Sequence, residues 1–205
     1  MTFGEMRQQL WDRLGITGEQ LLVQRCLNRG KDRFITARKW PFLETDAAQV
    51  FSTSTRSYTL GTAVEHLVAV EDASGNPVER IDRNAYDELY RNSTSTGTAP
   101  KVYAVDGSIS TTQAMRVHVW PSPSALNTGK IHYQVRVSDL GTTDTSNTYD
   151  HIPATHHFAV LDYAEAEFMN ARDMQEKAML AEQKAAQSVA QLANDLPQPQ
   201  IEDGT

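Results

Sequence analysis

The stretch LLVQRCLNRGKDRFITARKWPFL, residues 21–43, decides the fold class of this 205-residue chain. Its apolar residues recur every three or four positions, as on one side of an amphipathic helix. They are Val23, Cys26, Leu27, Gly30, Phe34 and Ala37. The other side is basic and carries Arg25, Arg29, Lys31, Arg33 and Arg38. The pattern predicts a helix from about Glu19 to Arg38 whose apolar side is buried by other helices.

Two details of this stretch sharpen the prediction. Glycine inside a helix is about 1 kcal/mol less favourable than alanine, so Gly30 is expected where another helix approaches closely. At the other end, Trp40 precedes Pro41, and a residue before proline avoids helical geometry. The helix is therefore expected to end before Trp40.

A shorter helix precedes this one. Thr2 and Glu5 have the spacing of a capping box, and Gly15 is placed to end the helix. Apolar residues at helical intervals lie between them, namely Phe3, Met6, Leu10 and Leu14. We expect residues 1–45 to form the N-terminal helical part of a bundle.

A third helical segment lies near the other end of the chain. Pro153 suits a first turn, and no proline or glycine follows from Thr155 to Ala193, so we predict one long helix within residues 151–195. Its expected core stripe is Phe158, Leu161, Ala164, Phe168 and Ala171. The alanine-rich second half has few large apolar groups and is expected to project or to pack against another subunit. Residues 196–205, LPQPQIEDGT, are predicted to be a flexible tail.

Residues 46–150 have a different pattern. Short runs rich in Thr, Ser, Val and Tyr alternate with turn residues such as Ser74-Gly75-Asn76-Pro77, which is typical of strands. A helix is expected at Asp82 to Arg91, capped by Asp82. The expected strands are 49–53, 57–60, 66–72, 101–105, 114–120 and 130–137. The sequence thus predicts an α+β fold, a helical bundle with an inserted β-rich domain like a sandwich or barrel.

Composition limits the classes of function. A single cysteine, Cys26, excludes an internal disulfide framework, and no apolar run reaches the roughly 18 residues of a membrane span. Net charge is +3 over residues 1–45, −4 over 46–150 and −6 over 151–205. The acidic balance argues against broad nucleic-acid binding, whereas a basic start and an acidic end favour attraction between copies.

Metal and nucleophile chemistry is not supported by the motifs. His151, His156 and His157 form the one local histidine cluster, but the i, i+4 pair of a helical zinc site is missing. Cys26 lies on an apolar stripe without a nearby activating histidine. We therefore predict no cofactor, no metal and no enzymatic activity.

Two alternatives stay open at this point. Carboxylate pairs such as Glu65 with Glu71, or Asp87 with Glu88, leave room for a wall-degrading enzyme, a peptidoglycan hydrolase. A glycan-binding module is the other alternative, although its aromatic residues alternate as core residues do. They are Tyr58, Tyr86, Tyr90, Tyr103, Trp120 and Tyr133.

The order of several segments resembles the head-to-tail adaptor, or connector, proteins of tailed bacteriophages. The two N-terminal helices ending in Trp-Pro-Phe are followed by APKVYAVDG, MRVHVWPSPS, GKIHYQVRVSDL and YDHIPATHHFAVLDYAEAEFM, and the likeness runs from Thr2 to about Ala178. The resemblance implies a structural virion protein of the neck, assembled in the host cytoplasm. It implies a ring, expected to be a dodecamer, that docks beneath the portal protein, lets double-stranded DNA pass during ejection and receives the next tail or neck protein.

The adaptor reading assigns roles to three sets of residues. Channel-lining residues that repel DNA phosphate are expected at Glu165, Asp173, Glu176 and Glu182. Portal-binding residues are expected at Leu192, Leu196, Pro197 and Ile201. Contacts between subunits are expected from Arg25, Arg29 and Arg33 on the basic side of the second helix.

Overall fold

The structure is a computed structural model that describes residues 1–92, 95–106 and 115–195. The chain is α+β and divides into two compact units. A helical unit combines Met1–Pro41 with the chain from Val137 onward, and a sheet unit spans Phe42–Arg136. Residues 137–150, which the sequence pattern assigns to the β-rich insert, cluster here with the helices.

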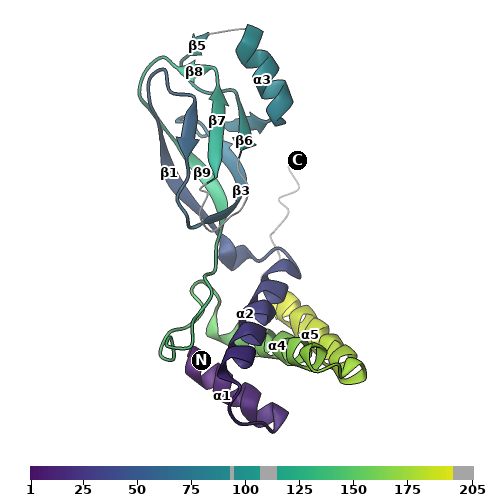
Figure 1. The fold of residues 1–205 in the computed structure, drawn as a ribbon. Coiled ribbons are helices and arrows are strands. Elements are labelled where there is room, and N and C mark those ends of the chain that lie inside the picture. Colours follow the sequence, from purple (N-terminus) through teal and green to yellow (C-terminus); the bar gives the residue numbers. More distant parts are fainter. Residues whose placement is uncertain (93–94, 107–114, 196–205) are drawn as a thin grey trace. The chain divides into compact units, whose positions relative to one another are not determined.

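The helical unit has four α-helices among the described residues, and they are drawn in Figure 1. They are α1 (Phe3–Leu14), α2 (Gln20–Thr36), α4 (His157–Ala171) and α5 (Gln175–Asp195), with the short 3-10 helix η2 (Ala154–His156) leading into α4. Helix α4 packs against α1, α2 and α5, so elements from both ends of the sequence share one core.

The predicted start and end of α1 are confirmed. The Thr2 hydroxyl accepts a hydrogen bond from the Glu5 backbone, and the Glu5 carboxylate accepts one from the Thr2 backbone, which completes the capping box. Gly15 ends the helix in the left-handed conformation with φ of 63°. Phe3, Met6 and Leu10, on the inner side of this helix, are fully buried.

The close approach predicted at Gly30 is also confirmed. A Cβ atom added to Gly30 would lie 2.7 Å from the backbone nitrogen of Ala164 and 2.7 Å from the carbonyl oxygen of Val160. Both atoms belong to α4. Glycine is therefore the residue that lets the backbones of α2 and α4 meet at this point.

The predicted single C-terminal helix is wrong, because the chain turns between α4 and α5. Asp173 adopts φ of 56°, the Met174 N–H donates to the Met169 carbonyl, and the Asp173 N–H donates to the Asn170 carbonyl. These bonds make a Schellman motif, with aspartate at the left-handed position usually held by glycine. Helices α4 and α5 consequently form an antiparallel pair rather than one rod (Figure 1).

The core stripe predicted for this segment needs correction at two positions. Phe158 is 53% exposed and Ala171 is exposed, whereas Leu161, Ala164 and Phe168 are buried as expected. Helix α4 is covered by neighbours on most of its circumference, so its buried residues do not follow a single stripe.

Within its described residues, the sheet unit has one seven-stranded sheet and a two-stranded one. The large sheet has the order β1-β9-β3-β4-β6-β7-β2, with all neighbours antiparallel except β4 and β6. Its strands are β1 (Glu44–Phe51), β2 (Ser57–Thr59), β3 (Val64–Glu71), β4 (Pro77–Arg80), β6 (Val102–Asp106), β7 (Arg116–Trp120) and β9 (Asn127–Val135). The small sheet pairs β5 (Thr96–Gly97) with β8 (Ser122–Pro123).

The large sheet curls into a half-barrel, which corrects the predicted sandwich or barrel (Figure 1). Alternate residues of its strands gather on the inner side, including Phe51, Leu67, Tyr103 and Val119, which are buried. Helix α3 (Arg83–Asn92) packs against β6 and β7, and the Asp82 side chain caps it as predicted. Most expected strands lie within a few residues of observed ones, while β4, β5 and β8 were not predicted.

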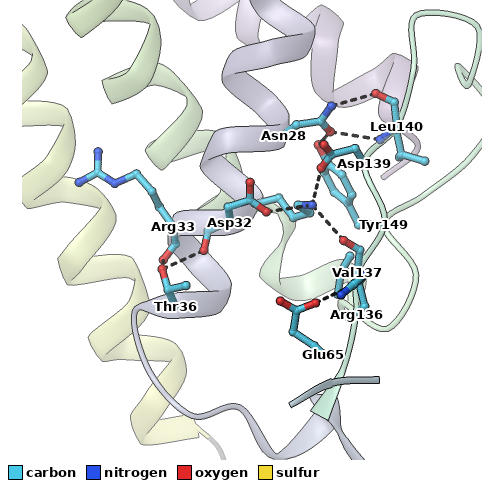
Figure 2. A network of polar contacts seen from close by, with 11 residues as sticks. Asn28, Asp32, Arg33, Thr36, Glu65, Arg136, Val137, Asp139, Leu140 and Tyr149 are labelled. Carbon is cyan, nitrogen blue, oxygen red and sulfur yellow. Dashed lines mark hydrogen bonds and ion pairs between the residues drawn. The ribbon is translucent and has the colours of Figure 1, made fainter. Parts of the chain in front are cut away.

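A long loop from Val137 to Pro153 is held to the first two helices by polar groups. Lys31 is 3% exposed and donates to the Val137 carbonyl at 2.9 Å and to Asp139 at 2.5 Å. Figure 2 shows how Asn28 on α2 bridges to Leu140 and to the Tyr149 hydroxyl. The loop therefore packs as a fixed part of the helical unit.

Candidate functional site

Asp162 on α4 is the most heavily bonded carboxylate of the helical unit. Its side chain is 3% exposed. The carboxylate oxygens lie 2.8 Å from Nη1 of Arg13 on α1, 2.9 Å from Nζ of Lys184 on α5 and 2.7 Å from Oγ of Ser188 on α5. Burial raises the pKa of Asp162, but the hydrogen bonds from Lys184, Ser188 and Arg13 outweigh it and hold the pKa below its ordinary value. The carboxylate therefore joins three helices as an anion.

The basic side of α2 also finds partners within the same chain. Arg33 contacts Glu167 at 3.1 Å and Glu182 at 2.8 Å, which links α2 to both α4 and α5. Arg29 is 69% exposed and lies 3.8 Å from Glu167. Arg25 is exposed and has no ion pair among the residues that the structure describes. A contact with a neighbouring subunit stays a prediction for these three arginines. Among them, Arg25 is the one whose exposed guanidinium has no ion pair within the described residues.

The four acidic residues predicted to line a channel separate into two pairs. Glu165 contacts Arg13 at 3.5 Å and Lys184 at 3.9 Å, and Glu182 contacts Arg33. Asp173 and Glu176 lie exposed at the turn between α4 and α5. The structure thus gives the first pair a bonding role inside the subunit and leaves the second pair accessible.

Of the residues predicted to bind a portal, the structure describes one. Leu192 lies near the end of α5 and is half-buried. Leu196, Pro197 and Ile201 lie outside the described residues, as does the whole predicted tail.

The outward side of α5 is exposed from Met179 to Asn194 and is mostly uncharged. Ala178, Ala181, Ala185 and Val189 face the core of the unit. Eight residues on the opposite side are exposed and uncharged: Met179, Leu180, Gln183, Ala186, Gln187, Ala190, Gln191 and Asn194. The exposed Lys184 borders this set, and its amine contacts Asp162. We call this set the α5 outer face. Met179 is 59% exposed and Leu180 is 65% exposed, which is unusual for large apolar side chains on a helix.

Two residues of the histidine cluster, His156 and His157, and the single cysteine are buried in the core, whereas His151 is exposed. His156 packs edge-on against Phe34 and Trp40, and His157 contacts the Ile152 carbonyl at 3.1 Å. Burial lowers the pKa of both imidazoles. Cys26 is 3% exposed, and burial raises its pKa to about 11. Within the described residues no group of three or more His, Cys, Asp or Glu side chains is arranged to hold a metal ion.

The aromatic residues of the glycan-binding alternative are mostly internal. Tyr58, Tyr86 and Tyr103 are at least 92% buried, while Tyr90 is 49% exposed and is covered on one face by the Arg56 guanidinium at 4.3 Å. Trp120 and Tyr133 are half-buried. The described aromatic rings therefore build the core of the sheet unit rather than a row of exposed stacking platforms.

Sequence reasoning missed the Asp162 centre. A lone aspartate inside the apolar run FAVLDYAEA was the available signal, because a charge among buried residues needs partners of opposite sign. Its partners lie 149 residues upstream at Arg13 and 26 residues downstream at Ser188, distances over which sequence spacing gives no information.

The described polar groups of the helical unit bind its helices to one another, and the α5 outer face presents apolar and amide side chains. These are the features of a structural protein that works through protein contacts. The model of the family described as SU10 adaptor protein matches residues 1–203, and the chain belongs to that family. The resemblance to phage head-to-tail adaptors is thereby confirmed, and family membership indicates a structural virion component rather than an enzyme.

No curated protein matches the chain. Among the described residues, no helix combines the length and the apolar character needed to cross a membrane.

Proposed function

We propose that this adaptor forms a ring of identical subunits beneath the portal of a tailed phage, using the α5 outer face as its main contact between copies. The ring, a dodecamer in this proposal, encloses the path of double-stranded DNA and presents a platform for the next neck or tail protein. The subunit carries out no chemistry, and it assembles in the host cytoplasm before it enters the virion.

The observation that carries this proposal is the composition of the α5 outer face. Eight of the nine exposed residues from Met179 to Asn194 are uncharged, and the ninth, Lys184, contacts Asp162 of its own chain. Exposed charge keeps a helix solvated, whereas small and amide side chains with two large apolar groups suit close contact with another helix. A second copy is the fitting partner, because two uncharged faces meet without repulsion or loss of ion pairs.

Other predicted residues take supporting roles in the ring. Arg25 is placed for attraction to an acidic neighbour, and the exposed pair Asp173 and Glu176 suits the DNA path, where negative charge repels phosphate and keeps the duplex from sticking. Leu192, with Leu196, Pro197 and Ile201 beyond it, is proposed to contact the portal.

Native mass spectrometry of the full chain, alone and mixed with the phage's portal protein, tests the proposal. The informative variant is Ala186→Glu with Ala190→Glu, which places two charges in the α5 outer face and keeps helix-forming residues. The matched control is Ala154→Glu, the same change at an exposed position outside α5. We expect rings from the wild type and the control, and monomers from the double variant with unchanged helical circular dichroism.

Two outcomes overturn this function. One is a double variant that forms rings as readily as the wild type, which would show that the α5 outer face is not the contact between copies. The other is a wild-type chain that stays monomeric in the absence and in the presence of portal, which removes the ring itself.

A further inference from the structure

A second polar cluster lies in the sheet unit, where α3 packs on β6 and β7. Arg83 is the first residue of α3, and His118 lies on β7. Both approach Asp106 at the end of β6, with Arg83 Nη1 3.9 Å and His118 Nε2 3.7 Å from the same carboxylate oxygen. Arg56 lies beside β7, where its carbonyl accepts a 2.8 Å hydrogen bond from Val119, and its guanidinium covers the ring of Tyr90 on α3 at 4.3 Å.

Three nitrogen atoms of this cluster are buried without a hydrogen-bond partner. They are Nη1 of Arg56, Nη1 of Arg83 and Nε2 of His118. The distances from Arg83 and His118 to Asp106 exceed the usual 2.7–3.2 Å of an N–H···O bond, so this carboxylate does not satisfy them. Buried donors in folded proteins are normally paired, and an unpaired group of this kind marks a place that a ligand can occupy.

Neighbouring groups hold the cluster in position. Arg83 Nε contacts the Asp87 carboxylate at 3.3 Å, and its guanidinium lies 5.4 Å from the Tyr86 ring centre. The Tyr86 hydroxyl in turn donates to the Val119 carbonyl at 3.2 Å, and its ring packs at 5.6 Å against His118. Arg83 stays 38% exposed, so a ligand reaches the cluster from the Arg83 side.

The charge of the cluster indicates the ligand. Arg116 lies directly opposite Asp106 in the β6–β7 pairing, so the region holds three arginines, Arg56, Arg83 and Arg116, and two carboxylates, Asp87 and Asp106. Burial lowers the pKa of His118, so with a neutral imidazole the net charge is +1. A single carboxylate balances that charge, whereas a phosphate dianion or the dense charge of DNA exceeds it.

We propose that Arg56, Arg83 and His118 form a binding site for a carboxylate side chain on an acidic peptide segment of a partner protein. The planar fork of an arginine suits the two oxygens of a carboxylate, and partial burial strengthens the contact relative to one in open solvent. The site is independent of the α5 outer face and lies in the other unit of the chain.

Titration of the full-length chain with a blocked tetra-glutamate peptide tests the site, with tetra-glutamine peptide and inorganic phosphate as comparison probes. Isothermal calorimetry gives the affinity, and NMR follows the His118 imidazole signals. Arg83→Gln is the informative variant. Arg91→Gln removes the same charge from an exposed position on the same helix and is its matched control.

We expect the glutamate peptide to bind the wild type, to shift the His118 signals and to bind Arg83→Gln about tenfold more weakly or worse, because a charge-assisted hydrogen bond is lost. The control should bind as the wild type does. His118→Gln provides a second variant with the same expectation should Arg83→Gln unfold. The proposal is overturned if the peptide does not bind, if binding leaves His118 unshifted, if the control loses as much affinity, or if phosphate binds equally well.

Discussion

Arg13 Nη1 lies 2.8 Å from Oδ1 of Asp162, an ion pair that joins the first helix of the chain to the fourth. The Asp162 carboxylate is 3% exposed, and Lys184 and Ser188 approach it from α5. One buried anion thus fixes the relative positions of α1, α4 and α5.

Replacing this anion should destabilise the helical unit strongly. Asp162→Asn removes the anion that Arg13 and Lys184 contact. Because these two side chains are 27% and 55% exposed and regain contact with water, we expect a loss of about 2 kcal/mol, as for hydrogen bonds to a charged group. Glu165→Gln is the matched control on the same helix, where the contacts are longer and more exposed and a loss under about 1 kcal/mol is expected. Urea unfolding followed by circular dichroism measures both; equal losses would contradict the central role of Asp162.

Gly30→Ala should destabilise the protein although alanine is the better helix former. The new methyl group would lie 2.7 Å from backbone atoms of Val160 and Ala164, so α2 and α4 must separate. We expect a net loss of about 2 kcal/mol in the free energy of unfolding, against a propensity gain of at most about 1 kcal/mol. Arg25→Ala, on the exposed side of the same helix, should stay within about 0.5 kcal/mol. A stabilised Gly30→Ala variant would show that the two helices are not in close contact.

Cys26 should resist thiol reagents in the folded protein. Its side chain is 3% exposed and its pKa is raised to about 11, so at pH 8 the reactive thiolate is both scarce and covered. With Ellman's reagent we expect slow release of the coloured anion from native protein and rapid release of one equivalent in denaturant. Rapid release from native protein would place Cys26 at the surface.

His157 should make stability depend on pH near neutrality. Burial lowers its folded pKa below the unfolded value of about 6.5, so as pH falls the unfolded chain takes up the proton first. Stability is therefore complete above about pH 6.5 and decreases as pH falls towards the folded pKa. Buried His156 acts in the same direction.

Urea midpoints between pH 5 and 8 measure this dependence. His157→Gln keeps a donor for the Ile152 carbonyl and should flatten the curve, whereas His151→Gln changes an exposed histidine and should leave it unaltered. The prediction fails if both variants retain the slope of the wild type.

Local signals in the sequence predicted local structure well. Thr2 with Glu5 marked the start of α1, Asp82 marked the start of α3, and Gly30 marked a close helix contact, since each depends on chemistry within a few residues or on the special backbone of glycine. The α+β class followed from the change of hydrophobic period between the helical and β-rich parts.

Features that depend on contacts between distant parts of the chain could not be predicted from such local signals. The turn at Asp173 lacks the glycine that usually marks a helix end, and Phe158 follows the helical period yet points to solvent. The curl and strand order of the sheet, and the meeting of Arg13 with Asp162, depend on which segments pair across the chain. Of the candidate sites, the unusual composition of the second half of α5 was visible in the sequence, while the cluster at Arg83 and His118 needed the fold.

The helical unit is built from two separate stretches of the chain, so the ribosome makes its helices at different times. Phe42–Arg136 is one uninterrupted stretch and can fold as soon as it leaves the exit tunnel, while α1 and α2, made earlier, still lack the helix that buries their apolar sides. They gain it after residue 171 has emerged, because α4 supplies the surface against which Gly30 rests. A chain whose α4 has not yet emerged therefore leaves the apolar sides of α1 and α2 uncovered, and such exposed apolar surface is prone to aggregation.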